Sequence, residues 1–250
     1  MTDFIAVIPA RFESSRLPGK PLADIAGQPM LYWVHRQVVA SGASEVIVAT
    51  DDERIAEAAR GFGANVQMTS EHHASGTDRI AELARRFDWA SDRIVVNVQG
   101  DEPLIPAVLP RQVADLLAAN PDASVATLAT HFVDQAEFEN GNTAKVILDN
   151  RSRALYFSRA PIPHRRDGGW PAVARRHVGI YAYRVDSLLE ISAAPPCAIE
   201  ECERLEQLRA MYLGYRIVVA DALEVPVHGV DTEADLAAIR RRMARGAGKA

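Results

Sequence analysis

Short apolar runs alternate with longer segments of helical period along the first 130 residues. Four of these runs are apolar on both faces of a strand, at residues 4–8, 45–49, 93–98 and 124–128. Such runs are typical of strands in a parallel sheet that helices cover on both sides. Helical period is found at residues 30–40, 52–62, 78–87 and 106–119. We therefore expect an α/β fold with a doubly wound, mostly parallel sheet.

The pattern changes after residue 130. Strand-like runs at residues 145–148, 154–157 and 177–183 follow one another without long helices between them. The polar, Pro- and Arg-rich stretch at residues 158–176 is typical of a long active-site or interface loop. Helical period returns at residues 199–212 and 232–242, and no change of composition marks a linker. We predict a single domain over residues 1–250, with a small antiparallel excursion at approximately residues 130–185.

Composition narrows the range of partners. The chain is 48% hydrophobic and 24% charged, which is ordinary for a globular protein, and its formal charge is −5. This balance argues against nucleic acid or a membrane surface as a partner. Two cysteines, Cys197 and Cys202, are too few for a disulfide framework. No signal peptide and no apolar run of about 18 residues is recognisable, so we expect a cytoplasmic protein.

The loop after the first predicted strand carries the strongest chemical signal. Arg11, Arg16 and Lys20 place three cations there, with the hydroxyl of Ser14 between them. Arginine offers multidentate donors and lysine a point charge, a combination that suits a polyphosphate; a solvated turn is the alternative interpretation. The spacing matches neither the P-loop nor the Gly-x-Gly-x-x-Gly fingerprint, which disfavours a dinucleotide dehydrogenase.

Two aspartates are candidates for a metal site. Asp101 follows the strand predicted at residues 93–98, where ligands bind in open α/β sheets, and Asp231 precedes the last predicted helix. Mg²⁺ commonly takes one or two protein carboxylates and completes its octahedron with water and phosphate oxygens. The alternatives are a β-turn at Asp101 and a helix cap at Asp231. A third polar loop, at Ser75 to Arg79, either caps a helix or binds a base or ribose.

Taken together and in this order, the motifs resemble the 3-deoxy-manno-octulosonate (KDO) cytidylyltransferase family over nearly the whole chain. They are Pro9-Ala-Arg-x-x-Ser-Ser-Arg-Leu-Pro-Gly-Lys-Pro21, His73-x-Ser-Gly-Thr-Asp-Arg79, Val96-Asn-Val-Gln-Gly-Asp-Glu-Pro103, Ala154-Leu-Tyr-Phe-Ser-Arg-Ala160, Arg176-His-x-Gly-Ile-Tyr181, Leu205-Glu-Gln-Leu-Arg209 and Gly229-Val-Asp-Thr232. The resemblance implies a nucleotide-diphospho-sugar transferase-like fold, CTP and KDO as substrates, CMP-KDO and pyrophosphate as products, and use in lipopolysaccharide synthesis. It also implies Mg²⁺ as cofactor and a homodimer.

The resemblance also implies roles for particular residues. Arg11, Ser14, Arg16 and Lys20 would bind the triphosphate, with Arg11, Lys20, Asp101 and Asp231 as the catalytic set and the two aspartates holding Mg²⁺. Ser75, Gly76 and Arg79 would border the cytidine, and Gln99 the ribose or the sugar. Arg159 would bind the KDO carboxylate, with His177, Glu206 and Gln207 around the sugar hydroxyls; an exposed helix face is the alternative for Glu206 and Gln207.

The sequence departs from the family pattern at two places, and alternatives remain open. His164 follows Ile162-Pro163 where the family usually has an aromatic residue, and Val227-His228-Gly229 stands where the family commonly has Gly-x-Gly. These departures concern loop detail and the identity of the sugar, so an 8-amino analogue of KDO is the alternative substrate. A catalytically inactive sensor that binds CTP is disfavoured by the presence of Lys20, Asp101 and Asp231.

Overall fold

The computed structural model describes residues 2–13 and 17–247. Its strands are β1 (Phe4–Ala10), β2 (Asp24–Ile25), β3 (Gln28–Pro29), β4 (Glu45–Thr50), β5 (Asn65–Met68), β6 (Ile94–Asn97), β7 (Val125–Thr130), β8 (Lys145–Leu148), β9 (Ala154–Ser158), β10 (Arg175–Arg184) and β11 (Ile217–Asp221). Its helices are η1 (Lys20–Leu22), α1 (Met30–Ala40), α2 (Glu53–Gly61), α3 (Gly76–Arg86), α4 (Val108–Ala118), α5 (Gln135–Glu139), α6 (Val185–Ala193), α7 (Ala198–Glu203), α8 (Gln207–Tyr212) and α9 (Glu233–Ala247).

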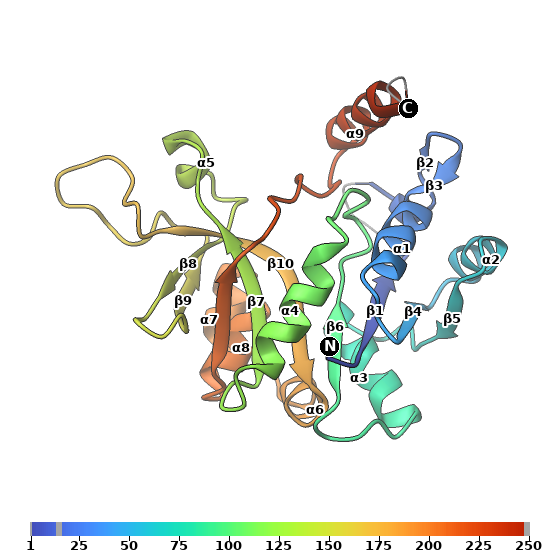
Figure 1. The fold of residues 1–250 in the computed structure, drawn as a ribbon, viewed down its shortest axis with the longest axis horizontal. Helices are drawn as coiled ribbons and strands as arrows, with labels where there is room; N and C mark the ends of the chain where they lie inside the picture. Colours follow the sequence, from blue (N-terminus) through green and yellow to red (C-terminus); the bar gives the residue numbers. More distant parts are fainter. Residues whose placement is uncertain (1, 14–16, 248–250) are drawn as a thin grey trace.

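One twisted sheet organises the molecule, in the order β11-β7-β10-β6-β1-β4-β5 (Figure 1). Along this path β10 runs antiparallel to both of its neighbours, and the other strands all point the same way. The alternating pattern of the sequence thus correctly predicts a mostly parallel α/β sheet. The antiparallel excursion consists of β8, β9 and β10, and its last strand returns to the middle of the sheet.

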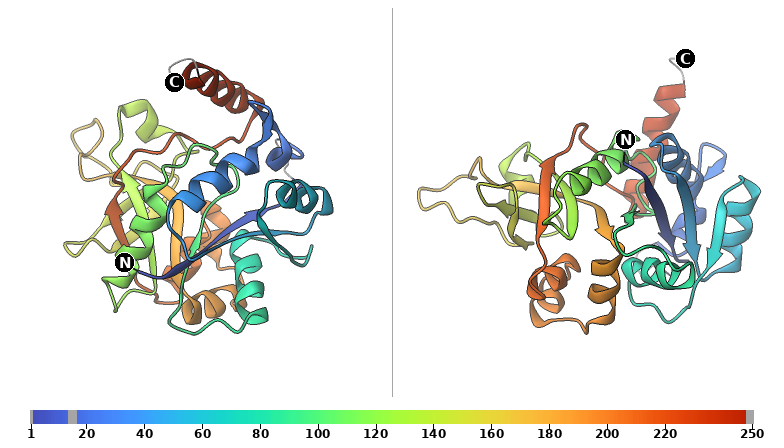
Figure 2. Two further views of the ribbon diagram at one scale, coloured as in Figure 1. Left: turned by 45° about the vertical axis from the view of Figure 1, so that its right-hand side comes forward. Right: turned by 60° about the horizontal axis from the view of Figure 1, so that its bottom comes forward.

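Helices cover both faces of the sheet, as a doubly wound fold requires (Figure 2). Side chains of β1 alternate between the two layers: Phe4, Ala6 and Ile8 pack with α1, α2 and α4, whereas Ile5 and Val7 pack with α3, α6 and α8. Both layers are fully buried along β1, which explains why its sequence is continuously apolar. Within the described ranges, no helix is long and apolar enough to cross a bilayer.

Several elements differ from the sequence prediction. The prediction of a single helix at residues 199–212 is wrong. α7 ends at Glu203, because the following residue, Arg204, has a left-handed backbone (φ 54°), and α8 begins at Gln207. The patterns also missed β5, β11, α5 and α6. β5 was missed because its sequence Asn-Val-Gln-Met contains no apolar run, as suits a strand at the edge of the sheet.

Candidate active site

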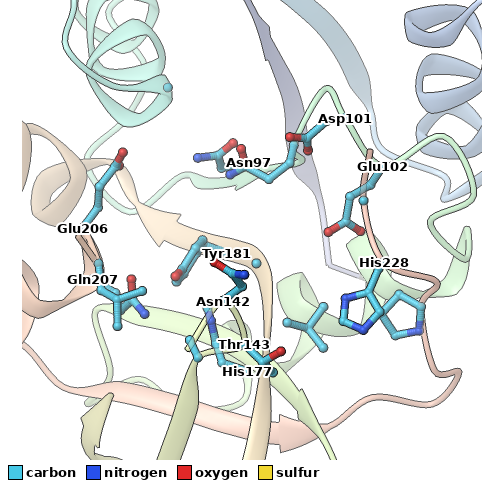
Figure 3. A pocket seen from close by; sticks show the side chains of 18 of the residues that line it. Asn97, Asp101, Glu102, Asn142, Thr143, His177, Tyr181, Glu206, Gln207 and His228 are labelled. Atoms are coloured by element: carbon cyan, nitrogen blue, oxygen red, sulfur yellow. The ribbon is translucent and has the colours of Figure 1, made fainter. Parts of the chain in front are cut away.

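The candidate site lies where β1 and β6 end, beside the first half of the antiparallel β10. Two adjoining cavities open there. The β1 cavity has a volume of about 280 Å³ and is lined by Arg11, Lys20, Ser75 and Arg79, among others. The β10 cavity has a volume of about 450 Å³ and is lined by residues of β6, β10 and the α7–α8 region (Figure 3). Five residues line both cavities: Gly76, Gln99, Asp101, Glu206 and Asp231.

Lys20 lies at the junction of the two cavities. Its Nζ donates to Asp101 Oδ2 at 2.7 Å and to Asp231 Oδ1 at 3.3 Å, and its side chain is only 14% exposed. The tight turn before it requires a glycine, because Gly19 has φ +68° and a Cβ there would come within 3.1 Å of the Phe12 ring. The structure thus brings together Lys20, Asp101 and Asp231, as the sequence analysis expected. Ser14 and Arg16 lie outside the described residues.

The loop that carries Asp231 is held against the loop after β6. Val230 N donates to Asp101 O at 2.8 Å, and a Cβ at Gly229 would come within 3.2 Å of the same oxygen. The side chain that caps α9 is that of Thr232, since Asp235 N donates to Thr232 Oγ1 at 3.2 Å, whereas Asp231 contributes its backbone N, which donates to Asp235 Oδ2 at 3.1 Å. The helix-cap alternative therefore applies to Thr232, and the Asp231 carboxylate faces Lys20.

The α3 loop caps its helix and also faces the β1 cavity. Ser75 caps α3 through a capping box with Asp78, and Ser75 and Gly76 also line the β1 cavity. Arg79 borders the same cavity but is 3% exposed, and its guanidinium donates to Thr69 Oγ1 at 2.8 Å and to the Asp51 carboxylate. These hydrogen bonds therefore hold the loop formed by residues 69–76 in place.

The β10 cavity has polar walls and an aromatic floor. A β-bulge between Val178 and Tyr181 shifts the register of β10 against β7, and His177 and Tyr181 on either side of it both line the cavity. His177 Nε2 lies 3.0 Å from Thr127 Oγ1, and burial lowers the pKa of the imidazole to about 3. His177 is therefore neutral at physiological pH and acts there as a hydrogen-bonding group.

Carboxyl groups face this cavity from two sides. Glu206 accepts from Thr77 Oγ1 at 3.0 Å, which ties α8 to the α3 loop, and burial raises the pKa of its carboxyl. Burial, and then the charge of Asp101, raise the pKa of Glu102 to about 8. Gln207 is buried and Glu206 is exposed, and both line the cavity.

Two arginines of the β10 cavity differ from expectation. Arg159 lines it, but its guanidinium donates to main-chain oxygens: Nε to Glu203 O at 2.7 Å, and the terminal nitrogens to Gly141, Asn142 and Arg204 at 3.3 Å. Arg176, to which the sequence analysis gave no role, also lines the cavity. Its Nη1 lies 3.1 Å from His228 Nε2 and 3.3 Å from Glu137 Oε1. The His228 departure is thus part of the cavity wall, whereas His164 is exposed on the long loop.

Sequence reasoning gave no role to several other residues of the site. Asn97 and Glu102 belong to the quoted Val96–Pro103 motif, and Thr77 to the Ser-Gly-Thr loop. Their place in these motifs was the only sequence feature that could have identified them as site residues. Within the part of the chain that is described, no group of three or more His, Cys, Asp or Glu side chains could hold a metal ion by itself.

A mostly parallel α/β sheet with a basic loop after its first strand and paired carboxylates at its edge defines a nucleotidyltransferase-like protein. The profile of the cytidylyltransferase family matches residues 5–217. The chain is 51% identical to the 3-deoxy-manno-octulosonate cytidylyltransferase of Vibrio parahaemolyticus, over 98% of this chain and 100% of the relative. It is 52% identical to the enzyme of the same name from Vibrio cholerae serotype O1, over 98% and 99%.

A solved structure of CMP:2-keto-3-deoxy-manno-octonic acid synthetase complexed with CTP superposes with a TM-score of 0.87. The two proteins are 42% identical, and the match covers 98% of this chain and 100% of that one. The chain belongs to the 3-deoxy-manno-octulosonate cytidylyltransferases, a family of nucleotidyltransferases.

Proposed function

We propose that this protein transfers CMP from CTP to the anomeric hydroxyl of KDO, giving CMP-KDO for lipopolysaccharide synthesis. The observation that carries the proposal is the junction at Lys20, where a cation and two carboxylates separate a basic cavity from a polar one. A triphosphate in the β1 cavity would reach the junction with its α-phosphate. A polyhydroxylated acid in the β10 cavity would reach it from the other side.

The reaction needs positioning and charge neutralisation more than covalent chemistry from the protein. The anomeric oxygen forms a bond to the α-phosphorus, and the bond from that phosphorus to the bridging oxygen breaks, releasing pyrophosphate. Arg11 and Lys20 would neutralise charge on the triphosphate as it develops toward the leaving group. Gln99, Glu206 and Gln207 would hold the sugar in line with the phosphate.

The residues at the junction fit Mg²⁺. Asp101 and Asp231 already accommodate one cation between them, the ammonium of Lys20, and their oxygens are the hard ligands that Mg²⁺ prefers. Two carboxylates are incomplete as a metal site without substrate, as expected for an ion that also binds phosphates. Asp101 and Asp231 would hold the ion, which would neutralise phosphate charge when bound.

The proposal extends to location and assembly. We place the enzyme in the cytoplasm, where CTP is made; the thiols of Cys197 and Cys202 are both free, which suits a reducing compartment. We also propose a homodimer. The exposed outer strand β9, with Leu155 58% exposed, supports this assignment.

Pyrophosphate release across nucleotides and acid sugars tests the activity. We expect CTP to be used well ahead of ATP and GTP, because a pyrimidine pocket excludes a purine ring, and UTP to be the best of the other nucleotides. KDO should be used ahead of its 8-amino analogue, because the relatives that are 51% and 52% identical are named for 3-deoxy-manno-octulosonate. Equal turnover with ATP would refute the proposal, and CTP binding without turnover would identify an inactive sensor.

A further inference from the structure

Buried polar atoms without a protein partner gather at the β10 cavity. In the described part of the chain, four buried side-chain nitrogen or oxygen atoms have no hydrogen-bond partner: Arg93 Nε, Asn97 Oδ1, Glu102 Oε2 and Gln207 Nε2. The last three belong to residues that line this cavity. Buried polar groups are normally paired, because leaving one unpaired carries the full penalty of desolvation. A cluster of three at one cavity therefore indicates groups that a ligand pairs.

Asn97 is the most informative of the three. It ends β6, whose preceding residues Ile94, Val95 and Val96 are all buried and apolar, and it is itself only 2% exposed. Tyr181 of β10 lies opposite it in the sheet. An apolar residue would suit this position better if packing were its purpose, because it would avoid the unpaired amide oxygen.

Glu102 and Gln207 approach the cavity from other elements. Glu102 follows Asp101 in the loop after β6, and Gln207 is the first residue of α8 and is 6% exposed. Figure 3 shows Glu102 and Gln207 on opposite sides of the cavity, with Asn97 between them in this view. The terminal torsions of Asn, Gln and Glu side chains are soft, so these atoms can turn toward a ligand without backbone movement.

The chemistry of the three atoms defines their ligand. Asn97 Oδ1 is an acceptor, Gln207 Nε2 is a donor, and the Glu102 carboxyl can accept or, when protonated, donate. One class of group complements all three: the hydroxyl, which both donates and accepts. We propose that Asn97 and Glu102, together with Gln207, bind hydroxyl groups of the acceptor sugar and so determine which acid sugars are used.

This inference rests on the proposed function. It goes further, because it assigns sugar specificity to Asn97 and Glu102, to which the sequence analysis gave no role. A structural role for the same atoms predicts a different result. Residues that only support the fold would affect both substrates and all sugars equally, whereas hydroxyl-binding residues affect one substrate and one hydroxyl each.

The test crosses enzyme variants with sugar analogues. Pyrophosphate release is measured for wild type, Asn97→Leu, Glu102→Leu and Gln207→Leu at saturating CTP, with KDO and with analogues that lack one hydroxyl each. KM for CTP is measured separately at saturating KDO with CTP varied. We expect each variant to lose about 10- to 100-fold in kcat/KM for KDO, with KM for CTP changed less than about twofold. Arg93→Gln is the matched control, because its unpaired nitrogen lies outside the cavity, and it should change neither value.

The decisive measurement is how each variant changes the discrimination between KDO and each deoxy analogue. Wild type should discriminate against a deoxy analogue about 10- to 100-fold, and the variant that lacks the partner of that hydroxyl should discriminate less than about threefold. Equal discrimination by wild type and all three variants overturns the inference. So does a parallel loss for CTP and KDO.

Two safeguards keep the outcomes distinct. If a leucine variant does not fold, as judged by its circular dichroism melting curve, Asn97→Ser or Glu102→Gln takes its place. The discrimination between KDO and the deoxy analogues is then measured in the same way. Wild type that releases no pyrophosphate with CTP and any acid sugar overturns the proposed function, and this inference with it. Active wild type with unchanged discrimination in the variants overturns the inference alone.

Discussion

At the scale of single residues, Lys20 occupies the position that Mg²⁺ would take in the proposed site. Its ammonium lies between two carboxylates that would otherwise repel each other across the junction of the cavities. The same lysine is the cation nearest to the transferred group in the proposed reaction. We therefore expect Lys20 to change partners, from carboxylates to phosphate, when substrate and metal bind.

Replacing Lys20 by alanine tests this assignment. Lys20→Ala should lower kcat/KM by about two orders of magnitude, roughly 2.7 kcal/mol of transition-state stabilisation. Steady-state pyrophosphate release gives the value, and Arg60→Ala, on the exposed face of α2, serves as the control. Full activity of the Lys20→Ala enzyme would favour the alternative interpretation of this loop as a solvated turn.

The aspartates should behave as one unit. Asp101→Asn and Asp231→Asn each keep the size of the side chain and remove the charge that would hold Mg²⁺, so each should lose most activity and need more Mg²⁺. The double variant should be little worse than the worse single one, because both residues act on one ion. Pyrophosphate release against Mg²⁺ concentration measures this.

An unchanged Mg²⁺ dependence in Asp231→Asn, combined with a lower melting temperature, would assign this residue to the start of α9 and contradict the two-carboxylate site. Thr232→Ala is the matched control for such a capping effect, because its hydroxyl accepts from Asp235 N.

The buried imidazole of His177 predicts a pH dependence of stability. Burial lowers its pKa to about 3 in the folded protein, against the value of 6.5 for a free imidazole. Between these values the unfolded chain binds a proton that the folded protein does not, so stability falls as the pH falls from 6.5 toward 3, by up to about 1.4 kcal/mol per pH unit.

His177→Asn removes this contribution. The difference in the free energy of unfolding between wild type and His177→Asn, measured by urea titration at pH 7, 5.5 and 4.5, should therefore shift in favour of the variant with each step. His164→Asn, on the exposed loop, is the control. A difference that stays constant over this pH range would contradict the prediction.

At the scale of elements, a buried ion pair joins α7 and α8. Arg209 of α8 donates to Glu200 of α7 through Nε at 2.7 Å and Nη2 at 2.5 Å, and the two side chains are 12% and 9% exposed. The pair holds the two short helices together behind Glu206 and Gln207. It thereby fixes the wall of the β10 cavity.

Arg209→Leu should destabilise the protein by about 3 kcal/mol, because it leaves the Glu200 carboxylate buried without its cation. The double variant Glu200→Gln/Arg209→Leu should recover part of this loss, since the charge is removed as well. Urea unfolding measures both, and Arg60→Ala breaks the exposed Arg60–Glu53 pair as control, with a cost below about 0.5 kcal/mol. An Arg209→Leu variant as stable as this control would contradict the prediction.

Periodicity and strand-end rules account for what could be predicted from sequence at this scale. Residues 30–40 carry a clear apolar stripe, and α1 spans those residues. The meeting of Lys20 with Asp101 follows from the rule that ligands bind at the carboxyl ends of parallel strands. The break at Arg204 could not be predicted, because a left-handed arginine has no signature in composition and no glycine marks it.

The partners of the arginines were equally beyond sequence reasoning. Arg79 and Arg159 occur in motifs at the site, yet their guanidinium groups bind Asp51 and the main chain around Glu203, respectively. Those partners come from segments distant in the sequence, and a motif describes only its own neighbours. For the same reason the sequence analysis gave no role to Asn97. It lines the cavity together with residues of β10, and only the structure shows this.

At the scale of the whole molecule, the β8–β9 hairpin lies at one side of the molecule, beside α7 and α8 (Figure 1). Within the described residues β9 pairs with β8 alone, so its other edge offers unpaired backbone groups beside the exposed Leu155. Such an edge suits contact with a second copy of the chain.

If the proposed homodimer uses this edge, Leu155→Lys should convert it to monomer, because a charge would be buried in an apolar contact. Sedimentation velocity measures the change. Leu223→Lys is the control, since Leu223 is 69% exposed beyond the end of β11. Monomeric wild type would contradict the homodimer, and a dimeric Leu155→Lys variant would exclude this edge as its interface.

The strand that joins the two halves of the sheet is among the later parts of the protein to be synthesised. β6 and β7 emerge from the ribosome before β10. β6 can pair with β1 on one side, but its other edge and the facing edge of β7 have no neighbour until β10 inserts between them. At about 5–20 residues per second, a nascent chain carries these two apolar edges unpaired for several seconds. Exposed edges of this kind attract other chains, so folding during translation should depend on chaperones more than the stability of the finished enzyme suggests.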